Sequence, residues 1–379
     1  MAKVLMKGNE AIAESAIRAG GLCYFCYPIT PQSEVAEYMS RRMPEVGGAF
    51  LQAESEVAVP NMVYGASGAG ARAWTSSSSP GISLMQEGIS YIAAAELPAV
   101  FVNIVRAGPG LGGILPSQGD YLQAVKGGGH GDYRCLVLAP SSVQEAVDMM
   151  PLAFDRADRY RNPVMVVGDG MIGQMMEPVE FKDREFPPLP AKDWATTGAK
   201  GRKPNLVNSL HLDPKVEEEL NVRLAAKYEK MRKEEVRSEE YNTDKPYRVL
   251  LVAYGTTARI CKTVIAELAA QGIAAALLRP ITLFPFPEAK VLELGRKAEF
   301  LLSVEMSMGQ MVEDVHCAMG HEKPVYFFGR AGGIVPSPGE VVQAVKTRLE
   351  GLPHCPTGDA EANDERRMTN AGTSEGGKS

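Results

Sequence analysis

The feature that most constrains the fold of this chain is a repeated alternation of short apolar runs with segments of helical spacing. The clearest run covers residues 99–105 and is almost continuously apolar. Strands buried on both faces have such runs, because helices then cover both sides of the sheet. Residues 22–27, 134–139 and 164–167 repeat the pattern, and a helical segment over 142–159 separates the last two. The alternation predicts an α/β fold with a doubly wound parallel sheet.

A second unit of the same kind follows a stretch of different character. This stretch contains proline-rich and lysine-rich segments that cannot build a sheet core. Its residues 215–237 are charged enough to form a solvent-exposed helix. Strand and helix patterns resume at residue 248, and the end of the chain is polar. We therefore predict a first domain over 1–176, a connector over 177–246, a second, smaller α/β domain over 247–352 and a disordered tail over 353–379.

Composition and charge argue against several functional classes. The chain has 379 residues, of which 45% are hydrophobic and 23% charged, as in an ordinary globular protein. Its net charge of -6 gives no basis for binding nucleic acid. No apolar run reaches the roughly 20 residues that a membrane helix needs. The N-terminal residues lack the apolar core of a signal peptide, so we expect a cytoplasmic location.

The six cysteines give no metal site by spacing. Only Cys23 and Cys26 lie close together, as C-x-x-C. A zinc or iron–sulfur site needs four ligands, and no second pair accompanies them. A thioredoxin-type pair lies at a helix start, whereas these residues flank Tyr24 and Phe25 within a predicted strand. We interpret both cysteines as packed strand residues and expect no metal bound by this chain.

Four strands of the predicted first domain end in residues that can carry chemistry. These are Thr30, Glu56, the run Ser76–Ser79 and Arg106. Ligands of open parallel sheets bind beyond the carboxyl ends of the strands, so we expect the four segments to meet. Three of them also have an ordinary structural explanation. Glu56 can be a carboxylate in the first turn of a helix, the serines can form a loop that caps a helix, and Arg106 can form a structural salt bridge. The nearby Pro60 implies that the helix after Glu56 kinks or begins later.

The convergence outlines half of a thiamine-dependent active site. The stiff turn over residues 27–31 presents Thr30, and together with Glu56 it can hold an aminopyrimidine ring and an oxoacid. Gly168-Asp169-Gly170 is similar to the start of a magnesium–diphosphate motif, but the next asparagine is the distant Asn205. We therefore interpret this triplet as a strand end followed by a turn. The diphosphate cradle must then come from elsewhere.

These residues resemble the alpha subunit of the 2-oxoacid:ferredoxin oxidoreductases. The resemblance covers roughly residues 1–180 and 245–350. The segments at 6–11 and 126–132 are most similar to members that act on 2-oxoisovalerate (3-methyl-2-oxobutanoate), although 2-oxoglutarate members share much of the pattern. The motifs that carry the family resemblance are 27–31, 54–56, 75–81, Arg106, 279–287 and 305–311.

The resemblance implies a pyrimidine-binding domain of thiamine-diphosphate enzymes, followed by a domain of transketolase C-terminal type. It also implies a separate beta subunit that holds the diphosphate and Mg²⁺. [4Fe-4S] clusters would lie in partner subunits of beta and gamma or delta type, with ferredoxin as electron acceptor. The implied reaction is the oxidative decarboxylation of a 2-oxoacid with CoA to acyl-CoA, CO₂ and reduced ferredoxin, and it would require the assembled complex.

The resemblance also assigns roles to single residues. Glu56 would hydrogen-bond the ring nitrogen of the cofactor's aminopyrimidine, and Thr30 and Arg106 would hold the oxoacid. The remaining cofactor contacts would come from Ile29, Ser77, Ser78 and Ser79. Two other classes stay open: a nicotinamide dehydrogenase needs a glycine turn where Thr30 and Pro31 lie, and a non-catalytic assembly subunit predicts that Glu56 and Arg106 are dispensable.

Overall fold

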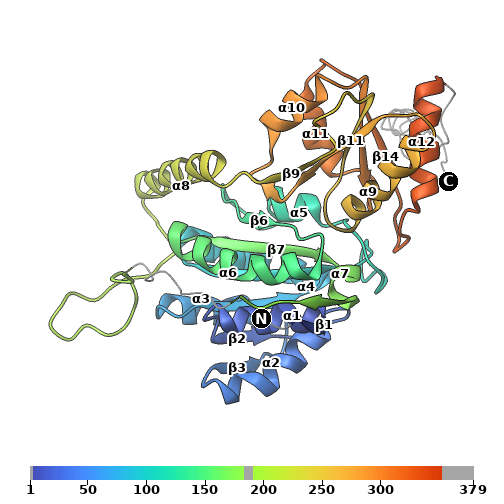
Figure 1. Ribbon diagram of the computed structural model, residues 1–379. Coiled ribbons are helices and arrows are strands. Elements are labelled where there is room, and N and C mark those ends of the chain that lie inside the picture. The colour runs from blue at the N-terminus through green and yellow to red at the C-terminus, as the bar shows by residue number, and fades with distance from the viewer. Residues whose placement is uncertain (1–2, 183–190, 352–379) are drawn as a thin grey trace, which may run out of the picture.

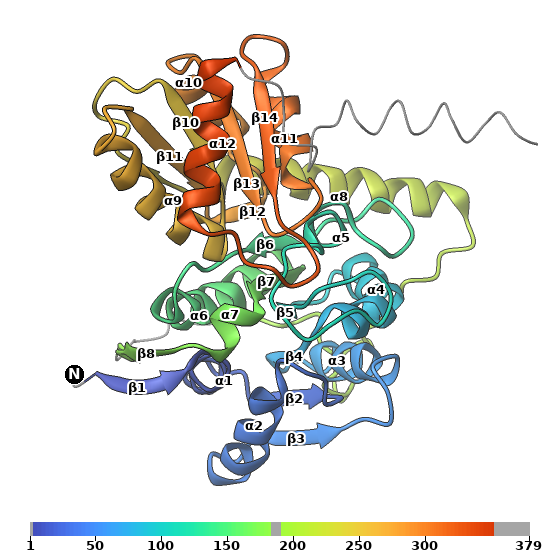
Figure 2. The same ribbon diagram turned by 90° about the vertical axis from the view of Figure 1, so that its right-hand side faces the viewer.

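The computed structural model describes residues 3–182 and 191–351, and all statements below concern these ranges. Two α/β domains lie one above the other, with helix α8 (Pro214–Glu234) beside their junction (Figure 1, Figure 2). The predicted disordered tail lies outside the described residues. Among the described residues, no helix combines the length and apolar character needed to cross a membrane.

The first domain contains a seven-stranded sheet in the order β12-β6-β7-β5-β4-β2-β3. Every pair in it is parallel except the edge pair β12–β6. The strands are β2 (Cys23–Cys26), β3 (Ala49–Gln52), β4 (Ala73–Ser77), β5 (Ala99–Val105), β6 (Leu136–Leu138), β7 (Pro163–Asp169) and β12 (Thr282–Phe284).

Helices cover both faces of this sheet, so the doubly wound parallel fold is confirmed. One buried cluster includes side chains of α3 and α4, and a second includes side chains of α1, α2 and α6. A two-stranded ribbon of β1 (Val4–Lys7) and β8 (Met176–Val179) lies beside α1. The helices are α1 (Gly8–Arg18), α2 (Ser33–Glu45), α3 (Ala58–Gly68), α4 (Ser79–Ala94), α5 (Tyr121–Lys126), α6 (Val143–Tyr160) and α7 (Gly170–Gln174).

The second domain is a smaller five-stranded sheet in the order β14-β13-β10-β11-β9, parallel except for β9. Helices α9 and α12 pack on one face, and α10 and α11 contribute to the core on the other. The elements are β9 (Ser238–Tyr241), β10 (Val249–Val252), α9 (Gly255–Ala269), β11 (Ala275–Pro280), α10 (Glu288–Gly295), β13 (Phe300–Glu305), α11 (Met311–Met319), β14 (Val325–Gly329) and α12 (Pro338–Glu350).

The connector is tied to both domains. Its first strand, β8, pairs with β1, and its last strand, β9, pairs with β11. The charged helix predicted here exists as α8, but it is not exposed all round. Leu220, Leu224, Tyr228 and Met231 recur at helical spacing and are buried against the core. The expectation of a solvent-exposed helix was therefore wrong for the face of α8 that carries these four residues. Their apolar spacing is difficult to recognise in the sequence because charged residues surround them.

Candidate active site

The loops that follow β2, β3, β4 and β5 meet at the carboxyl edge of the first sheet. Arg106 directly follows β5, and its guanidinium donates to the Thr30 carbonyl at 2.8 Å and to the Leu111 carbonyl at 2.9 Å. Its backbone N–H donates to Ser79 Oγ at 3.0 Å. Three of the residues predicted from the sequence, Thr30, Ser79 and Arg106, are thus brought into one hydrogen-bonded group. Ile29 is half-buried in the same loop as Thr30, whose side chain is exposed.

Arg106 is only partly available to a substrate. It is 7% exposed, and two backbone carbonyls already use its terminal nitrogens. Its Nε is buried and has no hydrogen-bond partner among the described residues. A buried donor without a partner costs free energy, so such a group indicates either a ligand or strain. The expectation that Arg106 binds the substrate carboxylate stays a prediction. Its bonds to the Thr30 and Leu111 carbonyls also hold these loops in place.

Glu56 lies in a turn just before α3, not in the first turn of a helix as the sequence analysis expected. The helix begins at Ala58, which places Pro60 in its first turn. There the amide has no helical partner, so the missing N–H of Pro60 is tolerated. The alternative expectation, a helix that begins later than Glu56, is confirmed. Glu56 is buried, with 8% of its surface exposed.

Glu56 and Ser77 approach each other across Gly81, in the first turn of α4. A methyl group on Gly81 would lie 2.1 Å from Ser77 Oγ and 2.9 Å from Cγ of Glu56. Only glycine fits between these two side chains. The sequence analysis included Gly81 in the motif 75–81 but did not predict that Glu56 and Ser77 approach it, although glycine costs about 1 kcal/mol relative to alanine inside a helix.

The three serines differ in what their hydroxyls contact. Ser77 Oγ is buried and has no hydrogen-bond partner among the described residues. Ser78 Oγ donates to the Ile104 carbonyl at 2.7 Å, a bond that joins the loop to β5. Ser79 Oγ is bonded to the Arg106 backbone. Ser77 therefore has the hydroxyl best able to accept a ligand, whereas Ser78 and Ser79 serve the loop structure. All three cofactor contacts remain predictions.

Two polar side chains beside this site, the buried Gln32 and the half-buried Asp120, were not found by sequence reasoning. Gln32 accepts from Ser76 Oγ at 2.6 Å, while its Nε2 is buried without a partner in the described chain. Asp120 accepts from Asn103 at 2.8 Å, and burial raises the pKa of its carboxyl. No motif marked either residue, because their contacts depend on loops that meet only in the folded chain.

Asp169, in the glycine–aspartate–glycine triplet, is a helix cap and an interdomain contact. Strand β7 ends at Asp169, as predicted, and a short helix follows in place of the expected turn. Its carboxylate accepts from the Met171 and Ile172 amides at 3.0 and 3.2 Å, and from the Thr256 hydroxyl at 2.9 Å. These bonds occupy the carboxylate with structural partners.

The C-x-x-C pair lies in β2, as predicted. Cys26 is buried, and burial raises the pKa of its thiol to about 11. Cys23 is half-buried, and burial also raises the pKa of its thiol. Both thiols are therefore protonated near neutral pH and behave as packed side chains.

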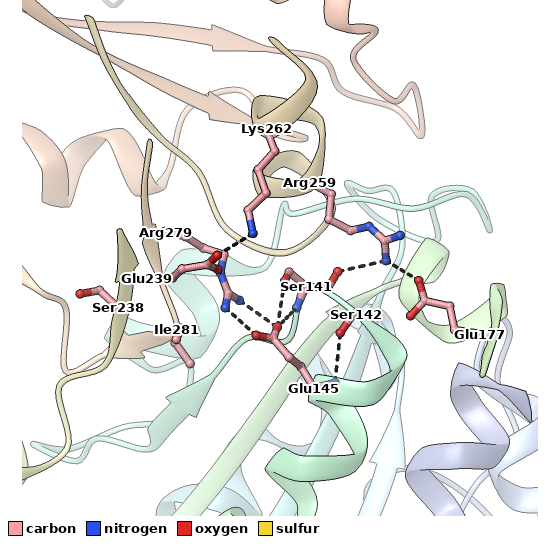
Figure 3. A pocket seen from close by; sticks show the side chains of 10 residues that line it. All are labelled: Ser141, Ser142, Glu145, Glu177, Ser238, Glu239, Arg259, Lys262, Arg279 and Ile281. Carbon is pink, nitrogen blue, oxygen red and sulfur yellow. Dashed lines mark hydrogen bonds and ion pairs between the residues drawn. The ribbon is translucent and has the colours of Figure 1, made fainter. Parts of the chain in front are cut away.

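A separate cleft of about 750 Å³ opens at the junction of the two domains. Figure 3 shows its charged side chains pointing toward one another. Arg279 donates to both oxygens of Glu145, at 2.6 and 2.9 Å, and to Glu239 at 2.6 Å, while Arg259 pairs with Glu177 at 2.6 Å. The cleft is therefore an ion-paired domain junction. Its lining residues are Ser141, Ser142, Glu145, Glu177, Ser238, Glu239, Arg259, Lys262, Arg279 and Ile281.

Comparison with known proteins agrees with this division into two domains. Residues 14–242 match the family model for pyruvate flavodoxin/ferredoxin oxidoreductase, thiamine diphosphate-binding, and residues 248–341 match core domain II of pyruvate:ferredoxin oxidoreductase. The chain is 51% identical over 333 residues to ketoisovalerate oxidoreductase subunit VorB of Methanothermobacter thermautotrophicus, covering 88% of this chain and 94% of that protein. It is 40% identical to 2-oxoglutarate synthase subunit KorA of Archaeoglobus fulgidus, over 86% of this chain and 94% of that one.

A solved structure gives the same relationship. The 2-oxoglutarate:ferredoxin oxidoreductase from Magnetococcus marinus, with 2-oxoglutarate, coenzyme A and succinyl-CoA bound, superposes with a TM-score of 0.80 at 25% identity. The superposition covers 92% of this chain and 65% of that longer chain. A split gene transketolase, at 14% identity and a TM-score of 0.55, shares the fold. This chain therefore belongs to the 2-oxoacid:ferredoxin oxidoreductases, as an alpha-type subunit.

Proposed function

We propose that this chain supplies the pyrimidine-binding half of a thiamine-diphosphate site in a complex that oxidises 2-oxoisovalerate. The products are the branched acyl-CoA, CO₂ and reduced ferredoxin. The observation that carries the proposal is the group of buried polar atoms around Gly81 and Arg106, where Ser77 Oγ and Arg106 Nε have no partner among the described residues. The 51% identity to a ketoisovalerate oxidoreductase subunit supports the branched-chain substrate.

The residues present fit one half of the cofactor. When bound, thiamine diphosphate supplies an acidic ring carbon whose deprotonated form can attack an oxoacid carbonyl. Glu56, nearly buried beside Gly81, would hold a proton between its carboxyl oxygen and the ring nitrogen of the pyrimidine. Ser77 would bond the same ring system. The exposed Thr30 hydroxyl and the remaining donors of Arg106 would orient the carboxylate of the oxoacid.

Partner subunits complete the proposal. A beta subunit would hold the diphosphate and Mg²⁺, since the carboxylate of Asp169 is occupied by structural bonds. Beta-type and gamma- or delta-type subunits would carry [4Fe-4S] clusters that pass electrons to ferredoxin. The described residues include no group of His, Cys, Asp and Glu side chains suited to a metal ion. The cytoplasmic location, together with the absence of nucleic-acid and membrane partners, stays a prediction.

Anaerobic purification of the native complex through a tag on this chain tests the proposal. Co-purifying chains, iron and thiamine are identified, and reduction of a viologen dye is followed with CoA and a panel of oxoacids. We expect cluster-bearing partners and 2-oxoisovalerate as best substrate. A preference for 2-oxoglutarate would agree with the family assignment and contradict the proposed substrate. The 40% identity to a 2-oxoglutarate synthase subunit supports this alternative.

Glu56→Ala separates a catalytic from a non-catalytic subunit. Loss of the proton-holding carboxyl should reduce turnover of the assembled complex at least about 100-fold. The exposed neighbour Glu54 provides the matched control, because Glu54→Ala removes a similar charge from the same loop. Both variants should assemble normally. Near-normal turnover of Glu56→Ala would support the assembly-subunit alternative.

Arg106→Ala tests the substrate role. The Michaelis constant for the oxoacid should rise, because one carboxylate donor is lost. The variant also frees the Thr30 and Leu111 carbonyls, so Arg106→Lys is measured beside it as the variant that keeps the charge. An unchanged Michaelis constant in Arg106→Ala would remove Arg106 from the substrate site.

A further inference from the structure

The turn after β2 that carries Thr30 is held through its carbonyl oxygens. Arg106 donates to the Thr30 carbonyl at 2.8 Å. The next carbonyl, that of Pro31, accepts from Asn9 Nδ2 at 2.8 Å and from Gln174 Nε2 at 2.8 Å. Asn9 lies in the first turn of α1 and Gln174 at the end of α7, two helices that contact each other (Figure 2). Thr30 therefore lies between two anchored carbonyls, its own and that of Pro31.

Helix α2 does not use the Pro31 carbonyl. The helix begins at Ser33, and the Val35 amide donates to the Gln32 carbonyl at 2.9 Å. Pro31 is buried, and a buried carbonyl without a partner costs free energy. The side-chain amides from α1 and α7 supply the donors that the helix does not.

The carboxylate of Glu34 fixes the orientation of both amides. It accepts from Asn9 Nδ2 at 2.8 Å and from Gln174 Nε2 at 2.9 and 3.0 Å. Each side-chain NH₂ group has two N–H donors, so it can give one to Glu34 and one to Pro31. Burial acts to raise the pKa of Glu34, but hydrogen bonds from its own amide and from the side chains around it lower that pKa below the ordinary value. Glu34 is therefore ionised near neutral pH and holds both nitrogens toward the turn.

The hydroxyl of Thr30 has no comparable support from its own side-chain contacts. The residue is exposed, and its side chain forms no hydrogen bond with the other residues that the structure describes. The direction in which the hydroxyl points therefore depends on the backbone of the turn, and this backbone is held at the Thr30 and Pro31 carbonyls.

We infer that Asn9 and Gln174 are positioning residues that direct the Thr30 hydroxyl toward the oxoacid. This inference rests on the proposed function, which places the oxoacid at Thr30 and Arg106. Asn9 and Gln174 act through the Pro31 carbonyl and do not touch the substrate themselves. A misplacement of about 1 Å in a substrate-positioning group can cost up to about 100-fold in rate, so a small shift of the turn is enough to be measured.

The cofactor side of the proposed site is independent of this network. Glu56 and Ser77 approach each other at Gly81, on the loops that lead into α3 and α4. The bonds of Asn9 and Gln174 go to the turn and to α2 instead. A disturbed turn should therefore weaken oxoacid binding and leave the affinity for thiamine diphosphate unchanged, whereas a general loss of structure would affect both.

Three single variants test the inference in the assembled complex. Gln174→Met keeps most of the side-chain volume and removes both N–H donors, whereas Gln174→Lys keeps N–H donors at the end of the side chain. Gln144→Met is the matched control, because Gln144 Nε2 also donates to a backbone carbonyl, that of Glu180, at 3.0 Å. We expect the Michaelis constant for the oxoacid to rise at least about fivefold in Gln174→Met and to stay within about twofold in the other two. Calorimetry should show the same affinity for thiamine diphosphate in all three.

The second donor is removed by combining Asn9→Ala with Gln174→Met. The Michaelis constant of this double variant should exceed that of Gln174→Met, because the Pro31 carbonyl then has neither amide as a partner. Asn9 is fully buried, so urea unfolding of the isolated chain is measured beside it. Gln174 is exposed, and its single variants test the inference even if the double variant does not fold.

Thr30→Val separates failure of the inference from failure of the proposed function. It removes the hydroxyl and keeps the shape of the side chain, so the Michaelis constant should rise at least as much as in Gln174→Met. If only Thr30→Val raises it, the proposed function stands and the inference fails. An equal rise in Gln144→Met, or a parallel loss of affinity for thiamine diphosphate in Gln174→Met, would also overturn the inference. An unchanged Michaelis constant in Thr30→Val would remove Thr30 from the oxoacid site, and the inference with it.

Discussion

The active-site edge of the first domain and the junction between the domains are both rich in buried polar side chains, but they differ in how these are satisfied. At the junction, Arg279 donates three bonds to two carboxylates, and Glu305 accepts five, among them the first amides of α11. At the active-site edge, Ser77 Oγ and Arg106 Nε have no partner in the described chain. A satisfied network serves the fold, whereas an unsatisfied buried group indicates either a ligand or strain.

Breaking the junction should have the largest effect on stability. Arg279 is 2% exposed, and Arg279→Met leaves the carboxylate of Glu145 without its cation and Glu239 with Lys262 alone. We expect the free energy of unfolding to fall by about 3 kcal/mol, as for other broken buried ion pairs. The control is Arg248→Met, because the Arg248–Glu299 pair is about half exposed and such pairs contribute about 0–1 kcal/mol. Equal losses of unfolding free energy in the two variants, measured by urea unfolding, would contradict the expectation that the buried ion pairs stabilise the fold more than the exposed pair.

Filling the space at Gly81 should damage the active-site edge. The new methyl group of Gly81→Ala meets Ser77 Oγ at 2.1 Å and Glu56 Cγ at 2.9 Å, so both side chains must move. We expect a loss of about 1–3 kcal/mol in unfolding free energy, as for overpacked sites, and at least tenfold lower turnover of the complex. Gly65 of α3 is the matched control, since nothing lies within 4 Å of its added methyl group. Gly65→Ala should be neutral or stabilising by up to about 1 kcal/mol.

The sequence was sufficient for the parallel strands of the first sheet and for the edge at which the loops meet. Apolar runs and helical spacing are local signals, and the rule that ligands bind beyond the carboxyl ends of strands places Thr30, Glu56 and Arg106 together. For the helix after Glu56 the sequence left two alternatives, a kink at Pro60 or a start later than Glu56, and the structure has the later start. These features depend on residues a few positions apart.

Features that depend on distant segments could not be predicted. Strand β12 belongs by sequence to the second domain, yet it pairs with β6 of the first sheet. The buried stripe of α8 was concealed by its charges. The contrast between Ser77 and Ser78 has no sequence signal at all, since it depends on whether the Ile104 carbonyl lies within reach.

Two neighbouring serines allow a sharper test of the contrast. Ser77→Ala removes a buried hydroxyl without a partner, so the isolated chain should be unchanged or more stable by about 1 kcal/mol. Ser78→Ala removes the bond to the Ile104 carbonyl at 2.7 Å and should cost about 1 kcal/mol. In the assembled complex, calorimetry should show that Ser77→Ala lowers the affinity for thiamine diphosphate more than Ser78→Ala does, the reverse of their order in stability. If Ser78→Ala lowers both stability and affinity more, the Ser77 hydroxyl does not bind the cofactor.

The smallest effect concerns Asp169 and its dependence on pH. Burial raises the pKa of its carboxyl above the ordinary value of 3.8, although four bonds from Met171, Ile172 and Thr256 act in the opposite direction. Above that ordinary value the unfolded chain loses this proton while the folded chain retains it. Folding then binds a proton, so the contribution of Asp169 to stability decreases as the pH rises toward its folded pKa.

Asp169→Asn isolates this contribution from the other carboxylates. Asparagine can still cap α7. A difference in unfolding free energy between the two proteins that does not change with pH therefore carries no information on Asp169, and only the pH-dependent part of the difference does. In urea unfolding from pH 4 to pH 7, wild type should lose stability relative to Asp169→Asn as the pH rises. A difference that stays constant would mean that the bonds from α7 and Thr256 compensate the burial completely. Asp169 would then be as fully satisfied as Glu305, and the junction would contain no strained carboxylate at this position.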